Sequence, residues 1–397
     1  MATNQERKLS KDVVKAIGAM PLWAWDPSYA SLHRKALPEA IDEDDEEQSF
    51  RQFVDMGKRE PNARGTGRWL VTRERNSIAI VCIGDVEEAT VQGVKSYLSA
   101  FFYGRMQVEL HSSFPNVHVQ EDDKSISSKE KGTKKDKNAK PKDDSTLIMG
   151  SYAYSVQQAN VDGELCFEVF SLFDMLAYAV DDDEKHSNPY YCVIALVNHG
   201  LCEQVDDEYL AVLGRACGDR VCVVDARHAS ATTKKGTHIS KNSVSVTQTV
   251  AKRNLRTLLA TTAHETLHCF GLDHCITWQC LMNSHQVDEH EFLFLSPLNL
   301  KKLVYAMLPP SDQTKQGNDT MLVNRYVIQR YNALGGVLKS LGFSKDATWA
   351  YRKASLVEEA TKGSGGGRNV APVSSRNNTR DHHGGGSRKK KQQRKMY

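Results

Sequence analysis

Residues 263–283 read AHETLHCFGLDHCITWQCLMN, and this stretch contains the pattern H-E-x-x-H-x-x-G-x-x-H followed by a methionine. His264 and His268 are four residues apart, so on a helix they share one face and can bind the same metal ion. Gly271 permits a backbone turn with positive φ, which ends the helix and brings His274 back toward that ion. Three neutral imidazoles leave the fourth position of a zinc ion open for water, which is the arrangement of a catalytic site.

Glu265 lies between the two helical histidines and can reach a water molecule on the metal. Zinc lowers the pKa of that water, and Glu265 can take its proton as the water attacks a carbonyl group. A bare HExxH arises by chance in roughly one chain of this length in fifty. The glycine and the third histidine lower that frequency by a further factor of roughly several hundred. The motif therefore predicts a zinc site with Glu265 as the catalytic base.

The long motif and its methionine are typical of metzincins. The residues around it, His274-Cys275 and then Cys280-Leu281-Met282, resemble the archaemetzincin family, which carries HExxHxxGxxHC, four residues and then CxM. The resemblance implies a zinc metallopeptidase that hydrolyses peptide bonds, with aminopeptidase character as one option. By matching positions it implies a Met-turn at Met282, Glu265 as the base, and three zinc ligands, His264, His268 and His274.

The chain departs from this family in one respect. The family continues to a CxxC pair, and its four cysteines hold a second, structural zinc. Here no cysteine follows Cys280, and residues 296–303 read SPLNLKKL. Cys275 and Cys280 are therefore half of a second site, and two thiolates do not close a tetrahedral zinc site. His285 and His290 are an alternative source of ligands, but the sequence favours two free thiols and one catalytic zinc.

The composition says more about the cellular compartment of the protein than about its binding partners. The chain has 397 residues, a formal net charge of +3 and nine cysteines. An odd number of irregularly spaced cysteines in a long chain argues against a disulfide framework. The first residues lack the apolar region of a signal peptide, and no stretch is long enough to span a membrane. We expect a soluble protein of the cytoplasm, or of the nucleus if the basic tail directs it there.

Together with the resemblance, the elements predict an α/β (α+β) fold: a metzincin-like zincin domain with a mixed, mostly parallel twisted sheet and a long zinc-binding helix. We expect a polar lead-in over residues 1–65, whose acidic run 43–47 is a solvated surface. The metallopeptidase domain would cover 66–361, with a helical part at 297–361, and a disordered basic tail would cover 362–397. Residues 119–144 have almost no apolar content, which predicts a disordered insertion.

Within the domain, the buried run Ser77–Gly84, a helical pattern to Tyr103 and the strand Arg105–Leu110 predict a β-α-β unit. Residues 166–180 read as an apolar helix, and Tyr190–Val197 as a buried strand. Two further strands, Leu210–Cys217 and Arg220–Ala226, form a predicted hairpin. From about Ser245 a helix of about 25 residues leads to Gly271, and three helices follow from Leu298.

Two partners follow from these patterns. Residues near 211–217 should form the edge strand above the cleft, where an extended peptide or protein substrate can add through main-chain hydrogen bonds; an ordinary hairpin is the alternative. The basic tail, which ends in the cluster Arg388–Lys395, could contact nucleic acid or the nuclear import machinery, or only keep the chain in solution. The rival function is a catalytically weak or inactive metzincin-fold scaffold that binds other proteins.

Overall fold

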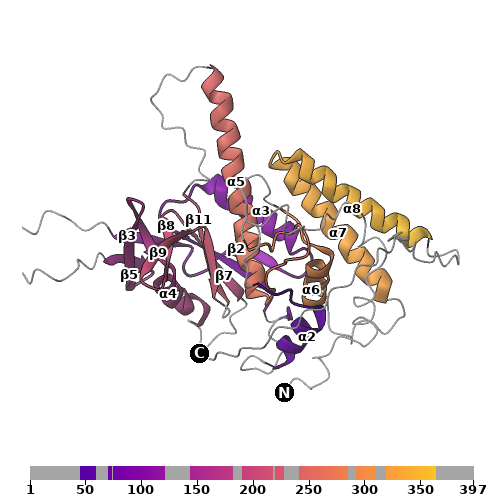
Figure 1. The fold of residues 1–397 in the computed structure, drawn as a ribbon, viewed down its shortest axis with the longest axis horizontal. Helices are drawn as coiled ribbons and strands as arrows, with labels where there is room; N and C mark the ends of the chain where they lie inside the picture. The colour runs from indigo at the N-terminus through magenta and orange to yellow at the C-terminus, as the bar shows by residue number, and fades with distance from the viewer. Residues whose placement is uncertain are drawn as a thin grey trace, which may run out of the picture.

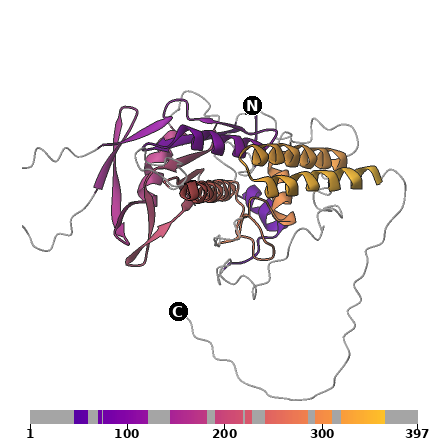
Figure 2. The same ribbon diagram turned by 90° about the horizontal axis from the view of Figure 1, so that it is seen from above.

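The computed structural model describes residues 45–59, 70–73, 75–120, 144–181, 190–217, 220–227, 241–284, 292–308 and 319–363. Their strands form one 11-stranded sheet with the order β10-β11-β7-β1-β3-β4-β5-β6-β8-β9, and β2 pairs with β1 beside this path. Figures 1 and 2 show the antiparallel strands at one end of the long axis and the helices α7 and α8 at the other, with α5 between them.

The centre of the sheet is parallel, as the sequence predicts. β1 (Ser77–Ile83) pairs in parallel with β2 (Gln107–Leu110), and α3 (Glu88–Phe101) crosses between them, which confirms the β-α-β unit. On its other side β1 pairs in parallel with β7 (Tyr190–Val197), and β7 with β11 (Val221–Asp225). β1 and β7 are buried at every residue, which explains why they read as continuous apolar runs.

The remaining strands make the prediction of a mostly parallel sheet wrong. Five pairings of the described strands are parallel and five are antiparallel. The physical reason is a set of tight turns, such as Asp162-Gly163, where both residues have positive φ and fold the chain back on itself. The antiparallel part consists of β3 (Asn116–Gln120), β4 (Asp144–Met149), β5 (Tyr152–Val161) and β6 (Glu164–Glu168), and then of β8 (Gly200–Val205) with β9 (Glu208–Val212).

Two predicted elements have the wrong bounds. Residues 166–168 are not helical, because Cys166 and Phe167 pair with β5 on one side and with β8 on the other; α4 begins only at Val169 and runs Val169–Asp181. The predicted strand Leu210–Cys217 is interrupted at Leu213. Its first part belongs to β9, and its second part is β10 (Gly214–Cys217), which is antiparallel to β11 as the predicted hairpin requires.

Helices cover both faces of the parallel strands, and alternate residues of β1 belong to two separate apolar cores. One core lies under α4. The other is shared with α3, α5 and the C-terminal helices, and it includes residues of the ligand loop described below. Because side chains of a strand alternate between the faces, a run buried on both sides needs both cores. Ile78, Ile80 and Cys82 face the larger core, and Ala79, Val81 and Ile83 face α4.

The long helix α5 (Lys241–Cys269) carries the first part of the metal motif. It ends where the sequence predicts, because Gly271 has a φ of 76° and the N–H of Leu272 donates to the carbonyl of Leu267 at 3.1 Å. This capping by a left-handed residue turns the chain back under the last turn of the helix. The first turns of α5 project beyond the body of the molecule (Figure 1).

Helices follow residue 297, where the sequence predicts a helical part. α6 (Pro297–Met307) is followed by α7 (Asp319–Ser340) and α8 (Ser344–Gly363), and the last two lie side by side in both views (Figures 1 and 2). α2 (Phe50–Arg59) packs against α6. Among the described helices, none has the length and apolar character that a membrane span requires.

Several predictions concern residues outside the described part of the chain. They include residues 1–44 of the lead-in, 121–143 of the insertion, and 364–397 of the basic tail. The ends of the predicted insertion are strands rather than irregular chain, since residues 119–120 belong to β3 and residue 144 begins β4. The division into a lead-in, a domain and a tail stays a prediction.

Candidate metal centre

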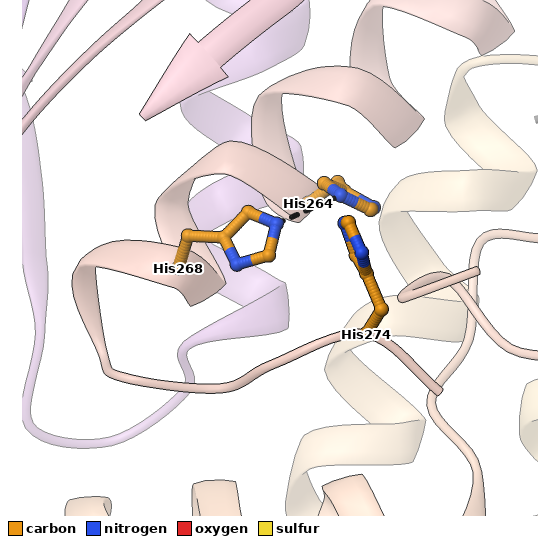
Figure 3. A group of neighbouring side chains, drawn as sticks. All are labelled: His264, His268 and His274. Carbon is orange, nitrogen blue, oxygen red and sulfur yellow. Dashed lines mark hydrogen bonds between the residues drawn. The ribbon is translucent and has the colours of Figure 1, made fainter. Parts of the chain in front are cut away.

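Three histidines from two segments meet at one point. His264 and His268 lie one turn apart near the end of α5, and His274 lies on the chain that returns after Gly271 (Figure 3). One nitrogen of each ring lies within 4.8 Å of the others, and this is the sole group of possible metal ligands in the described part of the chain. The structure therefore brings together the three side chains that the motif predicts.

The outer nitrogen of every ring faces an oxygen atom. Nδ1 of His264 lies 2.7 Å from the carbonyl oxygen of Leu281, and Nδ1 of His268 lies 2.8 Å from that of Leu272. Nδ1 of His274 lies 3.1 Å from both carboxylate oxygens of Asp45. A carbonyl or carboxylate oxygen can only accept, so each ring carries a proton on Nδ1, and a neutral ring then has its lone pair on Nε2.

The lone pairs of the rings therefore converge. Nε2 of His264 and Nε2 of His268 are 3.0 Å apart, a distance at which two lone pairs repel unless a cation or a proton lies between them. Two nitrogens that bind one tetrahedral zinc ion at about 2.0–2.1 Å are roughly 3.3 Å apart. Burial, together with His274, lowers the pKa of His264 to about 4, and burial also lowers the pKa of His268. His264 and His268 are thus neutral at pH 7, as metal ligands must be.

Glu265 lies at the contact between α5 and the edge strand β10. Its side chain is only 8% exposed, and a Cβ atom added to Gly214 of β10 would lie 2.9 Å from its Cγ. Burial raises the pKa of the Glu265 carboxyl group to about 8, with smaller effects from Cys269, Arg215 and Glu203. A buried carboxyl group with a raised pKa beside a cluster of possible ligands suits a general base.

The loop after α5, which we call the ligand loop (residues 271–284), contains His274 and the two carbonyl groups that face His264 and His268. Met282 is fully buried, and its carbonyl oxygen accepts the N–H of Cys275 at 2.6 Å. The neighbouring carbonyl of Leu281 is the one that holds His264. Met282 is thus a buried residue next to the one whose carbonyl group holds His264, and its role as a Met-turn stays a prediction.

Sequence reasoning missed residues 45–48, which we call the N-terminal strap. The prediction of a solvated acidic run is wrong for Asp45 and Glu47, because both carboxylates bind the ligand loop. Gln48 is 4% exposed and also contacts this loop. The alternation of Asp45 and Glu47 on one side of an extended segment is a weak signal at best, since their partners lie about 229 residues away.

The second predicted site has a different structure. Cys275 and Cys280 are fully buried, but no third histidine, cysteine or carboxylate joins them among the described residues, and His285 and His290 lie outside that part of the chain. We call this cluster the thiol pocket; it comprises Cys275 and Cys280 of the ligand loop and Ser296, Asn299 and Lys302 at the start of α6.

Hydrogen-bond donors and a lysine occupy the rest of the thiol pocket. Sγ of Cys280 accepts the N–H of Ser296 at 3.1 Å and the side-chain amide of Asn299 at 3.7 Å. Burial raises the pKa of the Cys280 thiol, but hydrogen bonds from Cys275 and from backbone N–H groups outweigh burial and lower it to about 7. Lys302 is 0% exposed, and burial lowers its pKa to about 8. These residues do not fit a second zinc ion, because two thiols are too few and the ammonium group repels a cation.

Comparisons with known proteins give a likeness in structure only. No protein-family model matches the chain, and no curated protein sequence matches it. The chain is similar to a solved archaemetzincin from Methanopyrus kandleri, with 14% identity and a TM-score of 0.31 over 65% of this chain and 99% of that one. It is also similar to an archaemetzincin from Archaeoglobus fulgidus in complex with malonate, with 13% identity and a TM-score of 0.33 over 57% and 99%.

A third solved structure, a zinc-dependent peptidase from Methanocorpusculum labreanum, has 14% identity and a TM-score of 0.32 over 57% of this chain and 99% of that one. Two of these neighbours are described as archaemetzincins and the third as a zinc-dependent peptidase. In this chain, three histidines form a cluster that could hold a metal ion. A likeness at this level assigns the chain to no family, so the chemistry of the centre has to come from its own residues.

Proposed function

We propose that this chain is a zinc-dependent metallopeptidase of archaemetzincin type. The observation that carries the proposal is the arrangement of the three imidazoles, whose Nδ1 atoms all face oxygen acceptors while their Nε2 lone pairs converge. Neutral imidazole nitrogens in a set of three, with a position left for water, are the donors that catalytic zinc prefers. Zinc bound there would supply a Lewis acid that polarises a peptide carbonyl group and lowers the pKa of a water molecule.

The chain's own residues divide the remaining work. Glu265 accepts a proton from the attacking water and later returns it to the nitrogen of the leaving amine. Burial raises the pKa of the Glu265 carboxyl group to about 8. A divalent cation nearby would favour the ionised form that a base requires. Because Glu265 is buried, bulk water has little access to its carboxyl group, so a proton that it accepts is not readily lost to solvent.

The edge strand β10 is the proposed support for the substrate. It ends the order of the described strands, and it lies directly against α5, which carries the helical histidines. Gly214 lets the two elements approach closely, since any side chain there would overlap Thr261 and Glu265. An extended peptide that adds to the free edge of β10 through main-chain hydrogen bonds would therefore run past the metal centre.

A peptide-library cleavage assay tests this function. We expect the zinc-loaded chain to cleave peptides, and we expect a chelator to abolish cleavage. The Glu265→Ala variant should keep its bound zinc and lose turnover by about 10²–10⁴-fold, because general-base catalysis contributes that much. Full turnover in Glu265→Ala would refute the assigned base. A zinc-loaded chain that cleaves nothing but retains peptides would support the rival function, a binding scaffold.

A further inference from the structure

We propose that Asp45 is a positioning residue for the metal centre, which holds the imidazole of His274 in the orientation and tautomer that a metal ion needs. This inference rests on the proposed function, since it requires the three histidines to bind zinc. It adds a residue far outside the motif, because Asp45 precedes His274 by 229 residues.

His274 needs outside support more than the other two ligands do. His264 and His268 lie on α5, whose backbone fixes their spacing, and their Nδ1 atoms are held by carbonyl groups of the adjoining chain. His274 lies on the ligand loop beyond Gly271, and its side chain is 26% exposed. Among the described residues, Nδ1 of its ring faces the carboxylate of Asp45, whose side chain is 21% exposed.

The strap holds the ligand loop on both sides of His274. The carboxylate of Glu47 accepts the N–H groups of Ile276 and Thr277 at 2.9 and 3.0 Å. The amide of Gln48 donates to the carbonyl of Gly271 at 3.1 Å and to the carboxylate of Asp273 at 2.8 Å. The carboxylate of Asp45 also accepts the hydroxyl group of Ser284 at the far end of the loop. These contacts fix the backbone of the loop, and among Asp45, Glu47 and Gln48 only Asp45 contacts a candidate ligand.

The strap in turn is fixed by the helix that follows it. Ser49 and Gln52 form a capping box at the start of α2, with N–H to side-chain distances of 2.7 and 3.2 Å. Phe50 and Phe53 then pack edge-on against Tyr305 of α6, with ring centroids 5.7 and 6.1 Å apart from it. Asp45 therefore projects from a segment that is anchored within five residues, which gives its carboxylate a defined position.

A carboxylate on the outer nitrogen of a ligand histidine has two effects. It fixes the ring with the proton on Nδ1, which leaves Nε2 free for the metal, and it makes Nε2 a stronger donor than a carbonyl partner does. Loss of such a partner costs about 10–100-fold in metal affinity. The charge of Asp45 thus acts on the metal centre through His274, and Asp45 itself is neither a metal ligand nor a substrate contact.

The test measures zinc affinity by competition with a chelator in the full chain. We expect Asp45→Ala to weaken zinc binding by about 10–100-fold and Asp45→Asn, which keeps an acceptor oxygen without the charge, to weaken it less. The matched controls are Ser284→Ala and Glu47→Ala, which remove other contacts of the strap and should stay within about threefold of the wild type. A second readout is nitrogen-15 histidine NMR of the metal-free chain, in which Asp45→Ala should release the His274 proton from Nδ1 to Nε2.

The outcomes separate this inference from the proposed function. A wild-type chain that binds no zinc overturns both. Tight binding that is lost in His264→Ala but unchanged in Asp45→Ala overturns the role of Asp45 alone. An equal loss in Glu47→Ala and Asp45→Ala, with no change of tautomer, also overturns it, because the strap would then act only by anchoring the loop. Should Asp45→Ala fail to fold, Asp45→Asn and the tautomer measurement decide the question.

Discussion

The histidine centre and the thiol pocket share the ligand loop, yet their chemistry is opposite. In the histidine centre, oxygen acceptors face the outer nitrogens and the inner nitrogens converge, so this cluster could hold a cation. In the thiol pocket, N–H groups point at the sulfur of Cys280, and the buried ammonium group of Lys302 provides the positive charge. The histidine centre could hold a metal ion, whereas the sulfur of Cys280 in the thiol pocket already accepts hydrogen bonds from the protein.

This difference shows what a metal site needs beyond metal-binding residue types. Both clusters contain good ligands, and both are buried. The histidine centre also has an acceptor behind every ligand and no competing charge inside, whereas Ser296 and Asn299 donate to the very sulfur that a metal would bind. The surroundings of a ligand therefore decide its use as much as the ligand itself does. The predictions below test this contrast, from the largest expected effect to the smallest.

The contrast is sharpest in the metal content of purified protein. We expect about one zinc ion per chain, bound by the histidine centre, because the thiol pocket does not close a tetrahedral site. His264→Ala should reduce the content to about zero, since two imidazoles hold zinc poorly. The matched variant Cys275→Ser should leave it unchanged. Mass spectrometry of the native protein measures the content, and a value of about two, or a loss in Cys275→Ser, would contradict the contrast.

The pH dependence of unfolding tests the lysine of the thiol pocket. Burial lowers the pKa of Lys302 from its usual 10.5 to about 8, so between these values the unfolded chain binds more protons than the folded chain. Stability should therefore rise with pH through this window, by roughly 3 kcal/mol for this group, whereas below pH 8 the full penalty of the buried charge remains.

The measurement compares the unfolding free energy of the wild type with that of Lys302→Met at pH 8 and pH 10.5. Methionine has a similar length and no charge, so titrating groups away from the thiol pocket contribute alike to both chains. The difference between the chains then reports Lys302 together with its effect on the neighbouring thiols and carboxylates. A difference that does not change with pH would show that the ammonium group is not buried as described.

The smallest effect concerns the contact between β10 and the histidine centre, for which the thiol pocket has no counterpart. A Cβ atom added at Gly214 would lie 2.8 Å from Thr261, 2.9 Å from Glu265 and 3.1 Å from the carbonyl of Val223. Gly214→Ala should cost about 1–3 kcal/mol of unfolding free energy through overpacking and should displace the proposed base. In the control Gly93→Ala the new Cβ would meet its nearest atoms at 3.8 Å, so that helix should gain roughly 0.5–1 kcal/mol. Denaturant unfolding measures the unfolding free energy of both variants. An equal change in the two variants would contradict the close contact at Gly214.

Much of the fold could be predicted where a local pattern suffices. β1 and β7 are buried on both faces and read as apolar runs, and α5 shows its apolar face and its end at Gly271. The bounds of α4 could not be predicted, because Cys166 and Phe167 are as apolar as the helix that follows. Only their pairing with β5 and β8 makes them a strand. The turn at Asp162-Gly163, by contrast, carries a hairpin signal in the sequence itself.

The candidate site divides in the same way. The ligand set followed from the spacing of three histidines and a glycine, since a helix of fixed pitch and one left-handed residue leave little freedom. Asp45 and Lys302 could not be assigned, because an acidic run and a helical lysine look like solvated surface in a sequence. Their roles depend on what lies across from them in the fold.

The sequence by itself determined which residues could bind a metal, where the long helix ends, and which strands lie in the interior. These features depend on neighbours within about one or two helical turns, for which spacing along the chain fixes spacing in space. Only the tertiary structure decided that the carboxylate of Asp45 contacts Nδ1 of His274 and that the buried ammonium group of Lys302 lies near two thiols. Such contacts join segments far apart in the chain, and no local periodicity encodes them.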